Sequence, residues 1–229
     1  MRGSEPERRD EDDSDLGAVL DDLKSAGCAL LVTGTEIEAC LATSRRLFGD
    51  PSQRRRRVLV THETGPDADR WLPEGVSVDD DDTELLSPSL FDRGAASESA
   101  EVDDSPTPAP STAGLGRLRT DLSDVISGYQ SDRLDPGEVR VGITSADALA
   151  SRYGRDELLT FVRTATALIR GVRGMGHLRL GQSLDGDLVP LLEGLFDARV
   201  DVRKQPGLPA EQRWHVPDYG TTEWIRVED

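Results

Sequence analysis

Residues 28–48 read CALLVTGTEIEACLATSRRLF, and this stretch decides the fold. Ala29 to Val32 is an unbroken apolar run, which indicates a strand buried on both faces, as in a parallel sheet. Gly34 predicts a tight turn, and apolar residues then recur at helical spacing up to Phe48. The residues expected on the buried side of this helix are Ile37, Cys40, Leu41, Leu47 and Phe48. A strand, a glycine turn and an amphipathic helix in this order are typical of an α/β domain.

The turn after this strand lacks the residues that bind phosphate in nucleotide-binding proteins. A phosphate loop is a glycine-rich run ending in Gly-Lys-Ser/Thr, whose backbone N–H groups and lysine hold the phosphates. Here Gly34 is followed by Thr35, Glu36, Ile37 and Glu38. Carboxylates in the first turn of a helix occupy the positive end of its dipole, and each costs roughly 1 kcal/mol or more against a bound polyphosphate. The stretch therefore predicts an α/β fold in which the phosphate loop is missing.

The chain is acidic along its whole length. It has 229 residues with 27 Lys and Arg against 44 Asp and Glu, a formal net charge of −17, and its only lysines are Lys24 and Lys204. Carboxylates that repel one another in dilute buffer are screened at molar salt, where the Debye length is about 3 Å. We therefore expect a cytoplasmic protein from a salt-loaded cell, and the alternative is an ordinary acidic protein with an acidic tail. Such a surface is unfavourable for nucleic acid.

Other classes of site are not predicted. The chain contains no apolar run long enough to span a membrane and no export signal, so we expect no membrane association. Cys28 and Cys40 match no zinc or disulfide pattern and are expected to be buried, small apolar residues. His62, His177 and His215 are the only histidines, and no two of them stand at metal-ligand spacing. The sequence therefore predicts no metal site and no cofactor.

The chain divides into segments by composition. Residues 1–13 are charged without apolar periodicity, so we expect a disordered acidic N-terminus. Residues 14–78 are expected to form the first half of one α/β domain, residues 79–114 an acidic, Pro/Ser-rich flexible insert, and residues 115–229 the second half with a C-terminal hairpin. Because a loop this long is uncommon within a compact domain, two separate domains are the alternative.

Further elements follow from the periodicity of apolar residues. Helices are predicted at 14–26, 71–73, 115–129 and 155–173, and a helix with Pro190 in its first turn is expected to be capped by Asp187. Strands are predicted at 58–61, 76–78, 139–143, 175–180 and 200–202, with a final pair at 213–216 and 223–227. Strands that alternate with helices predict a three-layer α/β sandwich, in which a mostly parallel sheet ends in an antiparallel β-hairpin.

Several short motifs are similar to those of a known ATPase family. They are ITS at 143–145 followed by ADAL at 146–149, GMGHL at 174–178, LFDARV at 195–200 and QRWH at 212–215. Together with a strand that ends near Gly34, they resemble the RecA/KaiC-like core of the P-loop NTPase fold over residues 16–78 and 115–227. The chain looks most similar to a haloarchaeal group of degenerate KaiC-like proteins of unknown function.

The resemblance implies a nucleotide-binding fold from which the chemistry has been lost. Active members of the family hold the β and γ phosphates with a lysine, but the matching positions fall at residues 36–40, which contain no lysine. The strand that would present a magnesium-binding aspartate ends in Thr144 and Ser145. Asp147 comes two residues too late, so we expect it to be a helix-start or turn residue rather than a metal ligand.

Candidates for a ligand site remain at the ends of strands. Ligands of open α/β proteins bind at the carboxyl edge of the sheet. The candidate ligand-binding residues at that edge are Thr33, Gly34, Thr35, His62, Thr144 and Ser145. No residue is predicted to be catalytic.

Three functions are compatible with these features. The first is a non-catalytic RecA/KaiC-like module that acts through a protein partner or as a homo-oligomer, in a regulatory or signalling role. The second is a sensor or enzyme for a nucleotide or another small molecule, with an altered site at the carboxyl edge. The third, a transcription-associated protein, rests on the four consecutive arginines Arg54 to Arg57, which also fit a solvated turn with ion pairs.

Overall fold

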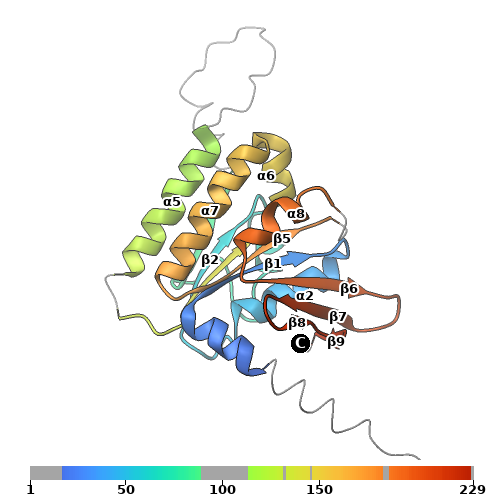
Figure 1. The fold of residues 1–229 in the computed structure, drawn as a ribbon. Coiled ribbons are helices and arrows are strands. Elements are labelled where there is room, and N and C mark those ends of the chain that lie inside the picture. The colour runs from blue at the N-terminus through green and yellow to red at the C-terminus, as the bar shows by residue number, and fades with distance from the viewer. Residues whose placement is uncertain (1–16, 89–112, 131–132, 145, 183–185, 228–229) are drawn as a thin grey trace, which may run out of the picture.

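Figure 1 shows the fold of the protein in a computed structural model, which describes residues 17–88, 113–130, 133–144, 146–182 and 186–227. The N-terminus that we predict to be disordered and most of the predicted insert, residues 89–112, lie outside the described residues.

The described residues form one nine-stranded sheet with helices on both faces. The strands are β1 (Cys28–Thr33), β2 (Arg56–Val60), β3 (Thr83–Leu86), β4 (Val139–Ile143), β5 (Met175–Leu180), β6 (Ala198–Lys204), β7 (Ala210–Val216), β8 (Gly220–Thr221) and β9 (Ile225–Arg226). The helices are a first helix at 17–26, α2 (Ile37–Phe48), α3 (Pro66–Asp69), α5 (Ala113–Tyr129), α6 (Ala146–Tyr153), α7 (Arg155–Gly171), α8 (Val189–Leu192) and the 3-10 turn η1 (Glu193–Leu195). None of the described helices is both long and apolar enough to cross a membrane.

The sheet is mostly parallel. Its strand order is β3-β2-β4-β5-β1-β6-β7-β8, and β9 also pairs with β7. The six strands from β3 to β6 in this order are parallel, whereas β7 is antiparallel to β6, and β8 and β9 are antiparallel to β7. The prediction of a mostly parallel sheet with antiparallel closing strands is therefore confirmed. We call the side where the six parallel strands end the carboxyl edge, and the side where they begin the amino edge.

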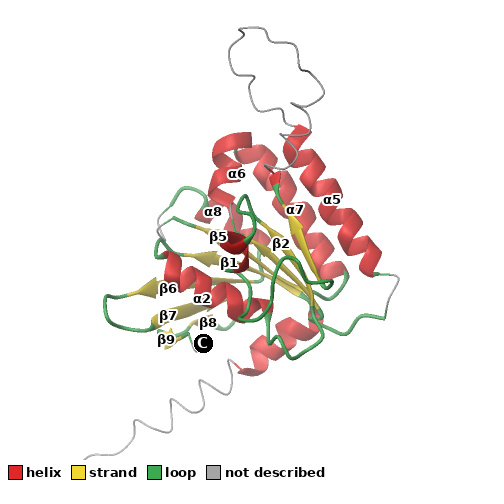
Figure 2. Ribbon diagram, turned by 180° about the vertical axis from the view of Figure 1, so that it is seen from behind, coloured by secondary structure: helices red, strands yellow, loops and turns green. Residues whose placement is uncertain are grey.

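Two layers of helices cover the sheet. In Figure 1, α5, α6 and α7 lie in front of the parallel strands, and the apolar residues of these helices form one core cluster with the facing side chains of the sheet. Figure 2, seen from behind, shows α2 on the opposite face, where it belongs to a second cluster together with β6 and β7. Strands β6 to β9 extend beyond α5, α6 and α7.

Strand β1 lies in the interior of the sheet. It pairs with β5 on one side and with β6 on the other, and all six of its residues are buried. Ala29 and Leu31 belong to the core cluster under α5 and α7, whereas Cys28, Leu30 and Val32 belong to the cluster under α2. An unbroken apolar sequence is what a strand covered on both faces requires. The sequence interpretation of this strand is confirmed.

The third strand lies later in the chain than predicted. Residues 71–73 and 76–78 are turns and loop, whereas the strand is Thr83–Leu86, which pairs in parallel with β2. This strand falls inside the segment predicted to be a flexible insert. It follows the acidic run 79–82, and that composition concealed a short strand that is held by pairing with its neighbour rather than by its own pattern.

Two side-chain predictions were also wrong. Ile37, which the pattern places in the buried stripe of α2, is the first residue of the helix and is 40 % exposed. Asp187 does not cap α8, whose N-cap residue Leu188 makes no side-chain cap. The Asp187 carboxylate instead accepts a hydrogen bond of 3.0 Å from Arg155.

His177 packs between β5 and α2 as a neutral structural residue. Its Nε2 lies 2.8 Å from the hydroxyl of Ser44, and its ring meets Phe48 edge-on with the ring centroids 5.0 Å apart. Burial, with a smaller effect from the charge of Arg140, lowers the pKa of His177 to about 3. The ring is therefore uncharged at neutral pH, and the sequence expectation that His177 is structural is confirmed.

Gly142 leaves the space that this packing needs. A Cβ atom at position 142 would lie 2.4 Å from Phe48 Cζ and 2.9 Å from His177 Cε1, both on side chains that are buried. We expect Gly142→Ala to lower the free energy of unfolding by about 1–3 kcal/mol, as overpacked core substitutions do. Chemical denaturation followed by circular dichroism measures this change.

Gly116→Ala is the matched control. Gly116 lies within α5, and a Cβ atom there would meet no atom within 4 Å. Because alanine is the better helix former, this control is expected to be neutral or to stabilise the protein by up to about 1 kcal/mol. Equal effects of the two substitutions would contradict the packing at Gly142.

Candidate functional site

The turn after β1 is closed by the neighbouring strand. A Cβ atom on Gly34 would lie 2.6 Å from Cγ2 and 2.7 Å from the carbonyl oxygen of Val202 in β6. Glycine is therefore required here by the close approach of β6. The Gly34 carbonyl oxygen accepts a bond of 3.6 Å from the thiol of Cys40, and its N–H donates to the carbonyl of Leu180. The backbone groups of Gly34 are thus engaged within the protein rather than directed at a ligand.

Thr33 is also engaged by β6. Its hydroxyl donates a hydrogen bond of 2.7 Å to Oδ1 of Asp201, and both residues are fully buried. The hydroxyl that we considered as a ligand donor is therefore part of the contact between β1 and β6.

The residues that follow Gly34 form an exposed turn. Thr35, Glu36 and Glu38 are all exposed at the start of α2, next to the exposed side chain of Ile37. Glu36 is the N-cap residue and makes no side-chain cap, and Glu38 lies 3.7 Å from Arg70. Two carboxylates thus flank the N-terminus of α2, as the sequence predicts. They oppose the approach of a polyphosphate.

The remaining candidates do not gather into one site with Thr33 and Gly34. His62 is exposed just after β2, and Thr144 is buried just after β4, with its backbone N–H bonded to the carbonyl of Val60. Ser145 lies outside the described residues. The strand order places β2 and β4 two or more positions away from β1. The structure therefore places these residues along the carboxyl edge rather than around one point.

Arg179 is a residue of this edge that sequence reasoning missed. It lies opposite Val32 in the pairing of β5 with β1, near the end of both strands. Its guanidinium stacks 5.6 Å from the ring centroid of Trp71 and bonds to the Thr144 carbonyl at 3.4 Å. The Nε atom is buried and has no hydrogen-bond partner among the described residues. A positive charge therefore stands near the turn that follows β1.

Asp147 stands close to this arginine and has a structural role. Its Oδ2 accepts a hydrogen bond of 2.5 Å from the backbone N–H of Gly181, which joins the first turn of α6 to the end of β5. Its Oδ1 is buried without a partner among the described residues. A Cβ on Gly181 would lie 2.7 Å from Arg179 Nη2 and 3.2 Å from Asp147 Oδ2, so both charges lie against this glycine. The expectation that Asp147 is a helix-start residue is confirmed.

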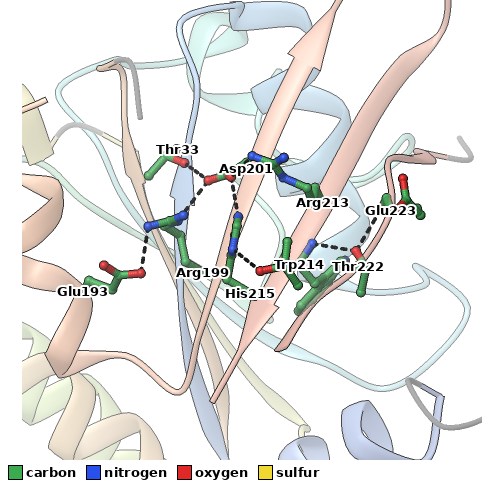
Figure 3. Close-up of polar contacts among 10 residues, drawn as sticks. Thr33, Glu193, Arg199, Asp201, Arg213, Trp214, His215, Thr222 and Glu223 are labelled. Carbon is green, nitrogen blue, oxygen red and sulfur yellow. Dashed lines mark hydrogen bonds and ion pairs between the residues drawn. The ribbon is translucent and has the colours of Figure 1, made fainter. Parts of the chain in front are cut away.

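A dense polar cluster lies beside this edge, centred on the buried carboxylate of Asp201 (Figure 3). Besides the hydroxyl of Thr33, its oxygens accept hydrogen bonds from Arg199 Nε at 3.0 Å, Arg213 Nη2 at 3.0 Å and His215 Nε2 at 2.5 Å. Arg199 also bonds to Glu193 at 2.7 Å. These side chains share one face of β6 and β7, because Asp201 pairs with Arg213 and Arg199 pairs with His215 in the antiparallel register.

The cluster is a structural clamp rather than a catalytic triad. Thr221, His215 and Asp201 stand in series, since His215 Nδ1 lies 2.9 Å from the Thr221 hydroxyl, and this order of groups is that of a hydrolase triad. However, two guanidinium groups already balance the carboxylate of Asp201. The Asp201 carboxylate is therefore held by ion pairs within the sheet, and the expectation that His215 is structural agrees with its contacts.

Burial raises the pKa of Asp201, but the hydrogen bonds from Thr33, His215 and Arg213 and the charge of Arg199 outweigh this effect and leave the pKa below its ordinary value. A carboxylate whose pKa is lower in the folded state stabilises the fold at every pH above its unfolded pKa of about 3.9. The stabilisation is lost as the pH falls from that value through the folded pKa.

The four arginines at 54–57 are engaged within the protein. Arg54 and Arg56 lie 3.3 and 3.8 Å from the buried carboxylate of Glu138, and Arg55 bonds to the carbonyl of Gly137 at 3.0 Å. Arg57 is almost fully buried and lies 3.9 Å from Asp82. These contacts favour the interpretation as a turn with ion pairs. β2 begins at Arg56, two residues before the predicted strand.

Comparison with known proteins gives a family but no activity. The model of a family of unknown function (DUF7504) matches residues 27–202, and the chain therefore belongs to that family. The match includes the six parallel strands up to Val202 in β6, and it excludes the first helix and β7 to β9. No curated protein matches the sequence. Among the described residues, no three His, Cys, Asp or Glu side chains are grouped so that they could hold a metal ion.

Asp201→Asn tests the clamp. The variant keeps the shape of the side chain but removes the charge that Arg199 and Arg213 share, so we expect the free energy of unfolding at pH 7 to fall by about 3 kcal/mol, as for a broken buried ion pair. The difference between wild type and variant is expected to shrink as the pH falls below about 4, where wild-type Asp201 becomes protonated. Urea denaturation between pH 7 and pH 3 measures both effects.

Asp187→Asn is the control for this experiment, because its ion pair with Arg155 is exposed and is worth at most about 1 kcal/mol. A pH-independent loss of stability in Asp201→Asn would contradict the role given to the charge.

Proposed function

We propose that this member of the DUF7504 family is a non-catalytic RecA/KaiC-like module that works through protein contact in a regulatory or signalling role. The observation that carries the proposal is the closed turn after β1, where Gly34 lies against Val202 and its carbonyl and N–H groups are bonded within the protein. A phosphate loop needs free N–H groups and a lysine at this position.

The sheet supports the RecA/KaiC-like part of the proposal. Its first strand lies between β5 and β6, helices cover both faces, and an antiparallel extension follows the sixth parallel strand. In such sheets the ligand crevice lies at the carboxyl ends of two neighbouring strands. The segment that follows one of these strands covers one face of the sheet, and the segment that follows the other covers the opposite face. Here β1 is followed by α2 on one face and β5 is followed by α8 on the other, so the crevice belongs beside Gly34 and Arg179.

Apolar side chains at the carboxyl edge suggest where a partner binds. Ile37 at the start of α2 is 40 % exposed, and Leu208 in the turn between β6 and β7 is 51 % exposed. These residues follow the ends of the neighbouring strands β1 and β6. We call them the edge pair. The crevice side of a nucleotide-binding sheet is normally occupied by ligand, whereas here it presents two apolar side chains that suit a protein contact.

A nucleotide-binding assay tests the loss of phosphate chemistry. We expect equilibrium dialysis with ATP and Mg²⁺ in KCl of about 1 M to show no binding above background, because the turn has no lysine, the N–H of Gly34 is already bonded to Leu180, and Glu36 and Glu38 repel the phosphates. The assay is repeated at low salt, where electrostatic attraction is strongest. Micromolar binding at either salt concentration would contradict the proposal.

The same assay distinguishes the non-catalytic module from the second candidate function, which is a nucleotide or small-molecule sensor with its site at the carboxyl edge. The observation in its favour is Arg179, whose buried Nε has no partner among the described residues. If Arg179 forms a ligand site, nucleotide binding should be present in the wild type and lost in Arg179→Gln. Absence of binding in both proteins supports the non-catalytic module.

Sedimentation velocity tests whether the protein binds a second copy of itself, which is the protein contact that the purified chain alone can make. We expect a species heavier than the monomer mass of 24.9 kDa. Replacing both residues of the edge pair, Ile37→Asp with Leu208→Asp, should restore the monomer because buried charges without partners oppose association. Leu191→Asp on α8 is the control, since Leu191 is a similarly exposed leucine outside the edge pair. A monomeric wild type would rule out self-association.

A further inference from the structure

A cavity of about 250 Å³ opens at the amino edge of the sheet, away from the turn after β1. Its walls come from the first helix at 17–26, the C-terminal end of α2, the beginnings of β1, β4 and β5, and strands β7 and β9. The apolar part of the lining is Leu20, Leu23, Leu30, Leu47, Met175 and Ile225. The cavity therefore offers an apolar interior for a small molecule.

The charged groups that line the cavity are all positive. They are Lys24, Arg46 and Arg140, and no Asp or Glu is among the lining residues. Lys24 and Arg46 are exposed at the rim, where Lys24 is bonded to Asp21 at 3.1 Å and is thus partly compensated. In a chain of net charge −17, a cavity lined by three cations and no anion is a local reversal of charge. It would attract an anion.

Arg140 is the buried member of these three cations. It is only 7 % exposed, and its guanidinium bonds to the carbonyls of Gly137 at 2.7 Å and Leu47 at 3.2 Å and to the sulfur of Met175 at 2.5 Å. None of these acceptors carries a negative charge. Burial lowers the pKa of Arg140 to about 10, so the group stays charged at neutral pH. A buried cation without an anion is costly, and an anionic ligand would relieve that cost.

A neutral hydrogen-bonding group of the lining is also unused. Trp214 is 5 % exposed, and its indole Nε1 is buried with no hydrogen-bond partner among the described residues. Buried N–H donors are normally satisfied, so an unpartnered indole in a cavity wall indicates an acceptor that binds there.

We propose that this cavity binds a small carboxylate with an apolar body, whose carboxylate lies toward Arg140 and the N–H of Trp214 and whose body lies against the leucines. Since a water molecule takes about 30 Å³ in the liquid, the volume holds roughly eight groups of that size. It is smaller than the roughly 300–1,000 Å³ of sites for drug-sized ligands. A medium-chain fatty acid matches this size.

The end of α2 does not oppose such a ligand. The C-terminus of a helix carries partial negative charge on its free carbonyl groups. Here the carbonyl of Leu47 accepts from Arg140 and the carbonyl of Arg46 accepts from the N–H of Gly49. These bonds satisfy the acceptors nearest to the cavity and leave its donors in excess.

Titration with octanoate, followed by the indole N–H signals in a ¹H–¹⁵N correlation spectrum, tests the proposal on the full chain. The protein has three tryptophans, and Trp214→Phe identifies the signal of Trp214 by its loss. We expect octanoate to shift the Trp214 signal saturably and to leave the signals of Trp71 and Trp224 in place. Octanol has the same chain without the charge, and it is expected to bind at least about tenfold more weakly.

Substitutions at the rim give a second readout that does not depend on the fold of the core. Arg46→Gln is expected to weaken octanoate binding about threefold or more in isothermal titration calorimetry at low salt, where surface charges are little screened. Arg45→Gln is the matched control, because Arg45 precedes it on the same helix and does not line the cavity. Trp214→Phe, a buried substitution that removes the N–H donor together with the five-membered ring of the indole and keeps a six-membered aromatic ring, is expected to weaken binding about tenfold.

Three results would overturn the proposal. They are an unchanged Trp214 signal at millimolar octanoate, equal affinities for octanoate and octanol, and equal effects of Arg46→Gln and Arg45→Gln. A melting curve that matches the wild type within about 2 °C shows that each variant is folded, so that lost binding is not a consequence of unfolding.

Discussion

The close contact of Gly34 with Val202 constrains the whole carboxyl edge of the sheet. Because Gly34 has no side chain, β6 can pair with β1 up to its last residue, and Thr33 then reaches the carboxylate of Asp201. Asp201 in turn binds Arg213 and His215 from β7, which attaches the antiparallel extension to the parallel core. The absence of a Cβ atom at position 34 thus allows the contacts that join β1 to β6 and, through Asp201, to β7.

The first strand and helix are predictable because their signals are local. An unbroken apolar run from Ala29 to Val32 and apolar residues at helical spacing up to Phe48 specify both elements without knowledge of the rest of the chain. β3 is not predictable in this way. Its sequence TELL follows four acidic residues, and only its pairing with β2 makes it a strand. Its burial depends on tertiary contacts that composition does not reveal.

The polar groups of the candidate site are hidden from the sequence for a related reason. Arg179 follows Leu178 in an ordinary strand pattern, and its place beside the first turn depends on the register of β5 with β1. The Asp201 cluster depends on the antiparallel register that sets Arg213 and His215 next to the carboxylate. A shift of one residue would point these side chains to the other face of the sheet. Spacing in the sequence therefore carries no signal for either group.

Buried arginine side chains join separate segments of the chain by hydrogen bonds. Arg57 and Arg140 are buried, and both bond to carbonyl oxygens at the ends of helices and turns. Arg57 also lies 3.9 Å from the carboxylate of Asp82. A planar guanidinium with five donors can satisfy several acceptors at once, whereas a lysine ammonium is a more strongly hydrated point charge. The many arginines of this acidic chain are thus explained in part by hydrogen bonding inside the fold, and a run of arginines in its sequence does not indicate a nucleic-acid surface.

The two edges of the sheet differ in how their charges balance. At the carboxyl edge, the unpartnered Nε of Arg179 and the unpartnered Oδ1 of Asp147 belong to side chains of opposite charge that both lie against Gly181. That edge is locally neutral and is bordered by the carboxylates of α2. In the cavity at the amino edge, the indole N–H of Trp214 is an unused donor, the carbonyls of Gly137 and Leu47 are already bonded to Arg140, and Arg140 has no anion among the described residues. An anion would therefore gain more at the amino edge than beside Gly34, although the ligands of open α/β sheets bind at the carboxyl edge.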